Sequence, residues 1–303
     1  MSRGNIQLLI VTVIWGINSI AVKDALGSFL PLQFNVVRLG LAAVLLLAVM
    51  TVTGKFELPS RRDWPMVMLA GFLGNTLYQF MYIKGIAMSS ASNTSFVLAT
   101  MPATTAVLSH LMGRQRMVLR MWAGVLLTVA GVAMIVLGSG GAPRLASGTP
   151  AGDLTTLGGT VGWCLCTIFA GDLTKRMSPT AYTAWTMVAG AVLMVPLSMG
   201  ELAGGKWSGI PAASWLELVF SASFALVLSY ILWNTGVKES GPASTAVFGN
   251  LAPVWTGFFG WLFLHEGWSR AKLLGAAVIL CGVSLVRFGQ STPLAESRAE
   301  HAD

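Results

Sequence analysis

The feature that most constrains this chain is a series of ten apolar runs, each about as long as a membrane is thick. An α-helix rises 1.5 Å per residue, so crossing ~30 Å of hydrocarbon takes ~20 mostly apolar residues. The runs are 5–26, 32–52, 64–83, 91–111, 121–139, 154–173, 180–199, 214–234, 243–264 and 271–288. Only 10% of the 303 residues are charged, too few to cover the surface of a water-soluble protein. We therefore predict an all-α membrane protein with ten transmembrane helices.

The two halves of the chain resemble each other. A displacement of 151 residues places Gly85 on Gly236, Pro102 on Pro253, Gly124 on Gly275 and Gly131 on Gly282, and near the start of each half a displacement of 148 places Trp15 on Trp163 and Pro31 on Pro179. Five helices per half is an odd number, so the second half enters the membrane from the opposite side. We predict two inverted five-helix repeats, 1–139 and 154–290, a linker at 140–153 and a disordered tail at 291–303.

The basic residues lie mostly in the short segments between the runs. If the N-terminus is cytoplasmic, twelve of them fall in inside segments and six in outside segments, and Arg38 lies within a helix. Cytoplasmic loops of membrane proteins carry the excess of Lys and Arg. Both termini are therefore predicted to be cytoplasmic, and the net charge of +7 does not indicate binding to nucleic acid.

Three segments carry a family resemblance. They read VIWGINSIAVKDAL in the first run, PLQFNVVRLGLAAVLLL in the second, and LHEGWSRAKLLGAAVILCGVSLV from the end of the ninth run through the tenth. With these segments the chain resembles the drug/metabolite transporter superfamily in its EamA-type branch. The resemblance covers nearly the whole membrane region. It implies a bacterial inner-membrane protein with ten helices, a central cavity, and export of amino acids or related metabolites. The first half departs from the pattern, with Gln115 where the family usually has the acid present as Glu266 in the second half.

Arg38 is the charged residue predicted to lie deepest in a helix. Counted by helix rise from Pro31, it stands ~10 Å into the membrane, where a cation costs ~2.5–3.5 kcal/mol on insertion scales. Two interpretations remain open. Arg38 contacts a substrate carboxylate, or it is a structural or snorkelling arginine bonded to helix-end carbonyls.

A polar and aromatic stripe marks the third run. Asn75, Tyr78, Gln79 and Tyr82 follow the spacing i, i+3, i+4, i+7 and share one helix face. Lipid would leave the two amides without partners, so the stripe should face inward. Other candidates for a substrate cavity are Asn18, Asn93, Trp163, Trp185 and Tyr230. The alternative for the aromatic residues is anchoring at the membrane interface.

Pro102 and Pro253 fall in the middle of the fourth and ninth runs, at equivalent places. Each removes a helical hydrogen bond, so each predicts a kink, either at a gate or tolerated by its neighbours. Glu266 follows the ninth run, and we expect it to be a loop charge near the start of the next helix rather than a gating or proton-linked carboxylate.

Motifs for other functions are absent from the sequence. No carboxylate occupies a helix centre, and there is no HExxH, no GxSxG and no P-loop. We therefore expect no catalytic residues, metal site or cofactor, and we predict a secondary transporter rather than an enzyme. Its partners would be a small molecule and the lipid bilayer, and the sequence does not indicate an oligomeric state. An aromatic cavity with amides but no acid favours neutral or aromatic amino acids as substrates. The predicted mechanism is alternating access, and the transport could be facilitated diffusion, which needs no ion gradient. A channel, or a membrane enzyme or receptor, remains the alternative.

Overall fold

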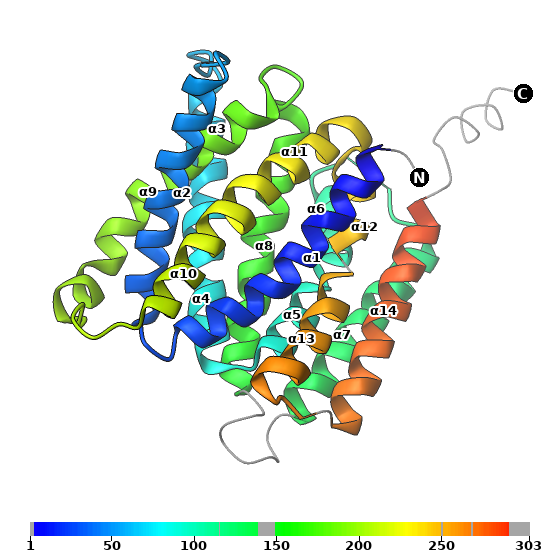
Figure 1. The fold of residues 1–303 in the computed structure, drawn as a ribbon. Helices are drawn as coiled ribbons and strands as arrows, with labels where there is room; N and C mark the ends of the chain where they lie inside the picture. Colours follow the sequence, from blue (N-terminus) through cyan, green and yellow to red (C-terminus); the bar gives the residue numbers. More distant parts are fainter. Residues whose placement is uncertain (1–2, 115, 139–148, 250, 268, 291–303) are drawn as a thin grey trace, which may run out of the picture.

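The computed structural model describes residues 3–114, 116–138, 149–249, 251–267 and 269–290, and the regular structure in these ranges is helical (Figure 1). All-helical membrane architecture is therefore confirmed. The predicted linker is described only from residue 149, and the predicted tail 291–303 lies outside the described residues. Below, the first half is the described chain up to residue 138 and the second half begins at residue 149.

The helices have the following bounds. The first half contains α1 (Arg3–Ala25), α2 (Pro31–Val52), α3 (Trp64–Gly71), η1 (Phe72–Leu77), α4 (Tyr78–Met88), α5 (Ala91–Leu98), α6 (Met101–Leu111) and α7 (Leu119–Gly138). The second half contains α8 (Pro150–Leu173), α9 (Pro179–Gly204), α10 (Ala212–Phe220), η3 (Ser221–Leu228), α11 (Ser229–Ser240), α12 (Pro242–Gly249), α13 (Ala252–Leu264) and α14 (Arg270–Gln290). Proline opens α2, α8, α9 and α12, because its fixed φ suits the first helical position and its missing N–H is not needed there.

Six helical stretches of the described chain are long and apolar enough to cross a membrane. They are 4–25, 31–52, 64–88, 150–173, 179–204 and 212–240, and the shorter apolar stretches 119–135 and 252–264 add to them. The third and sixth of these run through π-helical turns, η1 and η3. A π-helix bonds residue i to i+5, so each such turn changes which side chains face inward.

The fourth and ninth apolar runs differ from their prediction as continuous helices. Each is two short helices, α5 with α6 and α12 with α13, and the second helix of each pair has its proline at the second position. The proline ring clashes with the carbonyl four residues earlier and donates no hydrogen bond. The predicted kinks at Pro102 and Pro253 are therefore breaks, after which a new helix begins.

The last helices of the two halves, α7 and α14, pack side by side at one edge of the molecule (Figure 1). They run antiparallel, with Gly124 next to Gly282 and Gly131 next to Gly275. A Cβ on Gly124 would lie 2.5 Å from the carbonyl oxygen of Gly282. Small residues allow membrane helices to approach this closely. The interior of the molecule is enclosed by the other helices.

Candidate functional site: an aromatic cavity

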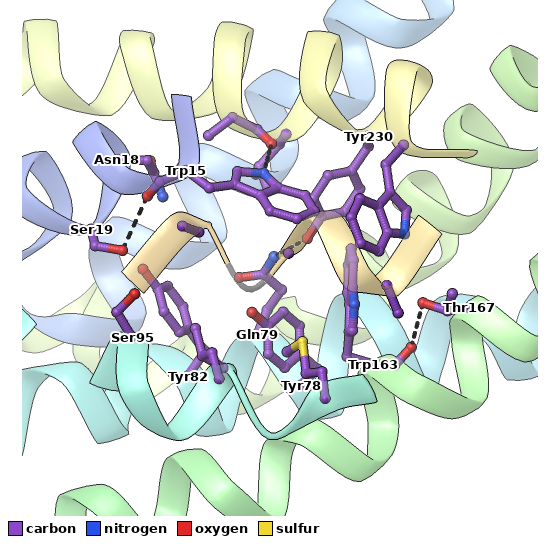
Figure 2. Close-up of a pocket in the computed structure, with 18 of the residues that line it drawn as sticks. Trp15, Asn18, Ser19, Tyr78, Gln79, Tyr82, Ser95, Trp163, Thr167 and Tyr230 are labelled. Atoms are coloured by element: carbon purple, nitrogen blue, oxygen red, sulfur yellow. Dashed lines mark hydrogen bonds between the residues drawn. The ribbon is translucent and has the colours of Figure 1, made fainter. Parts of the chain in front are cut away.

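A cavity lies where the two halves of the chain meet (Figure 2). Its wall combines residues of α1, α2, α4, α5 and α6 with residues of α8, η3, α11, α12 and α13. The empty space around these residues, about 830 Å³, includes open space outside the cavity, so the enclosed part is much smaller. Both proline breaks reach this wall, since Pro102 and Pro253 line it. The cavity is thus bordered by the discontinuous helix pair of each half.

Aromatic rings make up most of one side of the cavity. Trp163 is at their centre, with ring centroids 5.0 Å from Tyr230, 5.2 Å from Tyr78 and 5.8 Å from Trp15. Edge-to-face and tilted arrangements at such distances stabilise aromatic clusters. Because Trp15 and Tyr78 come from the first half and Trp163 and Tyr230 from the second, the cluster joins both halves around the cavity.

Arg38 of α2 lines the same cavity and is only 1% exposed. Its Nη1 donates to Ser221 Oγ at 3.0 Å, and its Nη2 donates to Asn35 Oδ1 and to Gln79 Oε1, each at 2.7 Å. Gln79 Nε2 in turn donates to the Tyr230 hydroxyl at 2.7 Å (Figure 2). The guanidinium is therefore connected to the second half through Ser221 directly and through Gln79 to Tyr230.

These partners of Arg38 are all neutral. Four ion pairs join described residues, and none of them includes Arg38. Arg38 is also the one charged residue among the described residues of the cavity wall. A buried charge is costly unless it is paired, so the cavity carries a positive charge that the described wall does not neutralise.

Three buried polar atoms of the wall have no hydrogen-bond partner among the described residues. They are Arg38 Nε, Asn18 Oδ1 and Trp233 Nε1. Buried polar groups in proteins are nearly always paired. These two donors and one acceptor belong to residues of the wall, and a small shift of these side chains would let a ligand in the cavity satisfy them.

Most of the predicted site residues come together in this cavity. Those in its wall are Asn18, Arg38, Tyr78, Gln79, Tyr82, Trp163 and Tyr230, together with Pro102 and Pro253.

Asn75 is not in the wall, contrary to the predicted stripe. It lies in η1 and packs on α9, where a Cβ on Gly190 would overlap its own Cβ. The neighbouring Thr76 hydroxyl donates to Gly190 O at 3.1 Å. The stripe assumed α-helical spacing, and the wider π-helical turn rotates Asn75 away from the face that carries Tyr78 and Gln79.

Trp185 is also outside the wall. Its Nε1 donates to Glu57 O at 2.8 Å, and its ring lies 5.4 Å from that of Trp64, at the start of α3. A Trp beside helix ends, with its N–H bonded to a loop carbonyl, is typical of a membrane-interface anchor. This placement fits the interface alternative for Trp185.

Asn93 lies apart from the cavity as well, in the first turn of α5. Its Nδ2 donates to Asp153 Oδ2 at 3.4 Å, and both residues are buried. Asn93 therefore belongs to a polar region that includes Asp153 and is separate from the cavity wall.

Two of the aromatic residues of the wall, Trp15 and Trp233, are not among the predicted site residues. The repeat contained a signal for Trp15, because the 148-residue displacement places it on Trp163. Trp233 is the equivalent of Tyr82 at the 151-residue displacement, so the same comparison could have found it.

A second polar region, here called the Glu266 cluster, consists of Glu266, Lys272, Ser92 and the backbone N–H of Ala91. Glu266 is 6% exposed rather than a solvated loop charge. Its Oε1 accepts from Ala91 N at 2.7 Å, and its Oε2 accepts from Ser92 N at 3.0 Å and from the Ser92 hydroxyl. Lys272 Nζ lies 3.8 Å from Oε2. The carboxylate from the second half thus caps the N-terminus of α5 in the first, as the helix dipole favours.

The chain matches the EamA-like transporter family over residues 2–137 and again over 150–288. It belongs to the EamA-like transporter family. Family membership and the apolar helices together establish a multi-pass membrane transporter of the drug/metabolite transporter superfamily.

Relatives of similar length agree. The uncharacterized transporter YyaM of Bacillus subtilis is 26% identical, over 92% of this chain and 91% of the relative. The uncharacterized inner membrane transporter YedA of Escherichia coli K12 is 28% identical, over 93% and 90%. A solved structure, described only as the crystal structure of a protein, covers 100% of both chains with a TM-score of 0.68 and 17% identity, which shows a shared fold.

Proposed function

We propose that this transporter exports neutral amino acids with aromatic or other apolar side chains, by alternating access of two inverted halves around the cavity. The observation that carries the proposal is the aromatic cluster of Trp15, Tyr78, Trp163 and Tyr230, which both halves build around a space lined by no described acid. An apolar side chain of a substrate would stack on Tyr78 and Trp163. Its charged backbone groups would meet the amides of Asn18 and Gln79 and the ends of the broken helices.

Contacts between equivalent positions support the inverted repeat. Gln79 and Tyr230, 151 residues apart, share a hydrogen bond, and Trp15 and Trp163 are equivalent at 148 residues and pack edge to face. Residues that contact their own equivalents lie near an axis that relates the halves. If each broken pair of helices counts as one span, and each helix that runs through a π-helical turn (α3–η1–α4 and α10–η3–α11) also counts as one, α1 to α7 form five spans, as do α8 to α14. An axis through the cavity is the arrangement that rocking of the two halves requires.

Facilitated diffusion is the energetic part of the proposal. Proton-coupled carriers usually place an acidic relay in the membrane core, whereas the described wall of this cavity contains no Asp, Glu or His. Export would then follow the gradient of the substrate itself.

Counterflow in liposomes tests the transport function. Purified protein in liposomes loaded with L-phenylalanine should concentrate external labelled L-phenylalanine transiently, and L-tryptophan should compete while L-lysine and L-glutamate should not. A channel would equilibrate the label without transient accumulation, and an enzyme would change the compound recovered. Absence of counterflow with every neutral amino acid, from protein that unfolds cooperatively, would reject the proposal.

The proposed orientation places both termini in the cytoplasm. In a variant whose three native cysteines are replaced, a cysteine in place of the exposed Ala151 should react with an impermeant reagent applied to intact cells. A reporter that is active only in the cytoplasm should be active when it is fused after Phe288. Labelling of the introduced cysteine only after cells are opened would reverse the orientation.

A further inference from the structure

Hydrogen-bond directions around Gln79 determine which groups the cavity offers to a ligand. Arginine has N–H donors and no acceptor, so the Gln79 atom 2.7 Å from Arg38 must be the carbonyl oxygen. The amide nitrogen therefore faces Tyr230 and donates to its hydroxyl oxygen, also at 2.7 Å. The hydroxyl hydrogen of Tyr230 is not used in that bond. Since Tyr230 lines the cavity, its hydroxyl can donate to a ligand there.

Further donors belong to the same wall. Arg38 Nε and Trp233 Nε1 are buried and have no partner among the described residues. Helices α6 and α13 also begin at the wall, where their first residues Met101 and Ala252 line the cavity, and a helix N-terminus is a region of positive potential. One guanidinium, a hydroxyl, an indole N–H and two helix starts favour a negatively charged ligand group.

The electrostatic balance separates the possible ligands. A carboxylate beside Arg38 makes the combined charge of ligand and described wall zero. A zwitterionic amino acid leaves a net charge of one positive unit. Its ammonium group can donate to the unpartnered Asn18 Oδ1. An amine without a carboxylate places two cations in one buried space, and like charges there are strongly disfavoured.

We infer that the cavity recognises its substrate by a carboxylate, so that it takes aromatic and other apolar monocarboxylates with or without an α-amino group and excludes the corresponding amines. This inference rests on the proposed transport function and widens its substrate class. The ammonium of an amino acid is then tolerated by the site and is not required for binding.

Three compounds with the same ring test the inference. L-Phenylalanine, 3-phenylpropionate and phenethylamine compete with labelled L-phenylalanine for the purified protein in lipid nanodiscs, where leakage of the compounds across a membrane plays no part. We expect 3-phenylpropionate to bind at least as tightly as L-phenylalanine. Phenethylamine should bind about 10²-fold more weakly or worse, because a charged hydrogen bond is lost and a second cation is added.

Two variants of one residue locate the effect. Gln79→Glu places a carboxylate against Arg38 and lets the Tyr230 hydroxyl turn to donate to it, so the preference for 3-phenylpropionate over phenethylamine should fall about tenfold or more. Gln79→Met has a similar length and brings no charge. Arg38 then remains unneutralised, and the preference should persist.

The results distinguish this inference from the transport function. If L-phenylalanine binds and is transported but phenethylamine competes as well as 3-phenylpropionate, carboxylate recognition is wrong and the transport function stands. Equal preference in both variants would also overturn it. If L-phenylalanine neither binds nor is transported, the proposed function fails and the inference fails with it. The three-compound comparison on the natural protein decides even if a variant does not fold.

Discussion

Lys272 and Arg38 are both buried cations, and their surroundings differ. Lys272 lies 3.8 Å from the carboxylate of Glu266, which in turn binds the backbone at the start of α5. Arg38 donates to a hydroxyl and to two amide oxygens, and it forms no ion pair with the described residues. The Glu266 cluster balances its charges internally, whereas the cavity does not.

This difference separates a structural site from a binding site. Removing one member of a buried ion pair leaves the other charge unpaired, so the Glu266 cluster should govern stability. A cation with neutral partners contributes little net stability, because its desolvation offsets its hydrogen bonds. Such a cation is better explained by a ligand whose negative charge neutralises it. Glu266 should therefore matter most for stability, and Arg38 most for binding.

The largest expected effect is on stability at Glu266. Glu266→Ala removes the acceptor of three hydrogen bonds and leaves Lys272 unpaired, which should lower the free energy of unfolding by ~3–5 kcal/mol. Thermal unfolding of the purified protein in detergent measures the change. Adding Lys272→Met to Glu266→Ala should recover part of the loss, since the buried ammonium that faced Glu266 is then removed as well.

Asp172 provides a matched control for Glu266. It is also a carboxylate paired with a cation, Arg114, at 2.6 Å, but its side chain is 34% exposed. Asp172→Ala should therefore cost only ~0–1 kcal/mol. Equal losses from Asp172→Ala and Glu266→Ala would show that burial and capping of α5 add nothing at Glu266.

Arg38→Met should have the opposite profile. Its unfolding free energy should stay within about 2 kcal/mol of the natural protein, since the lost hydrogen bonds are offset by removal of a buried charge. Affinity for L-phenylalanine should fall about 10²-fold, and Arg38→Lys, which keeps the charge, should lose less. Severe destabilisation with unchanged affinity would make Arg38 a structural residue and would end the contrast with Lys272.

The aromatic wall should show smaller effects on binding. Tyr78→Ala or Trp163→Ala removes ring contacts worth ~0.5–1.5 kcal/mol beyond the lost area, or up to roughly tenfold in affinity. Counterflow and binding should weaken, and the melting temperature of each variant is measured as well, because both rings are buried in the cluster and their loss also lowers stability. Thr51→Ala is the control, because the Thr51 hydroxyl is exposed and, among the described residues, bonds only within its own helix, at Ala48 O and Leu47 O. Unchanged flux and preference in both aromatic variants would reduce the wall to packing.

Helix content and several of the aromatic and polar residues of the cavity wall could be predicted from the sequence, because both follow from local patterns. Apolar length identified the six long apolar stretches, and the repeat and the polar spacing identified Tyr78, Gln79 and Trp163. The predicted position of Asn75 on the face of Tyr78 and Gln79 differs from the structure for a specific reason. A π-helical turn leaves no clear mark in composition, yet it turns the residues before Tyr78 toward α9.

The partners of the buried charged residues could not be predicted from the sequence. Glu266 and Ala91 are separated by 175 residues, and no local pattern indicates that a carboxylate after α13 caps α5. The same holds for Arg38 and Ser221, at a separation of 183. The sequence could mark Arg38 as costly, but only the packing of η3 and α4 around it shows that its partners are neutral.

The smallest expected effect is on the pH dependence of transport. No Asp, Glu or His belongs to the described wall, so the initial rate of counterflow should change less than about twofold between pH 6 and pH 8. An imposed proton gradient without a substrate gradient should drive no accumulation.

If such a gradient does drive accumulation, the coupling acid must lie outside the cavity. Asp24 and Glu217 are then the first to test, because they line a separate hollow between α1, α10 and α13. In that case Glu217→Gln should abolish uphill transport and leave counterflow intact, which would place energy coupling in a third polar region, distinct from both the cavity and the Glu266 cluster.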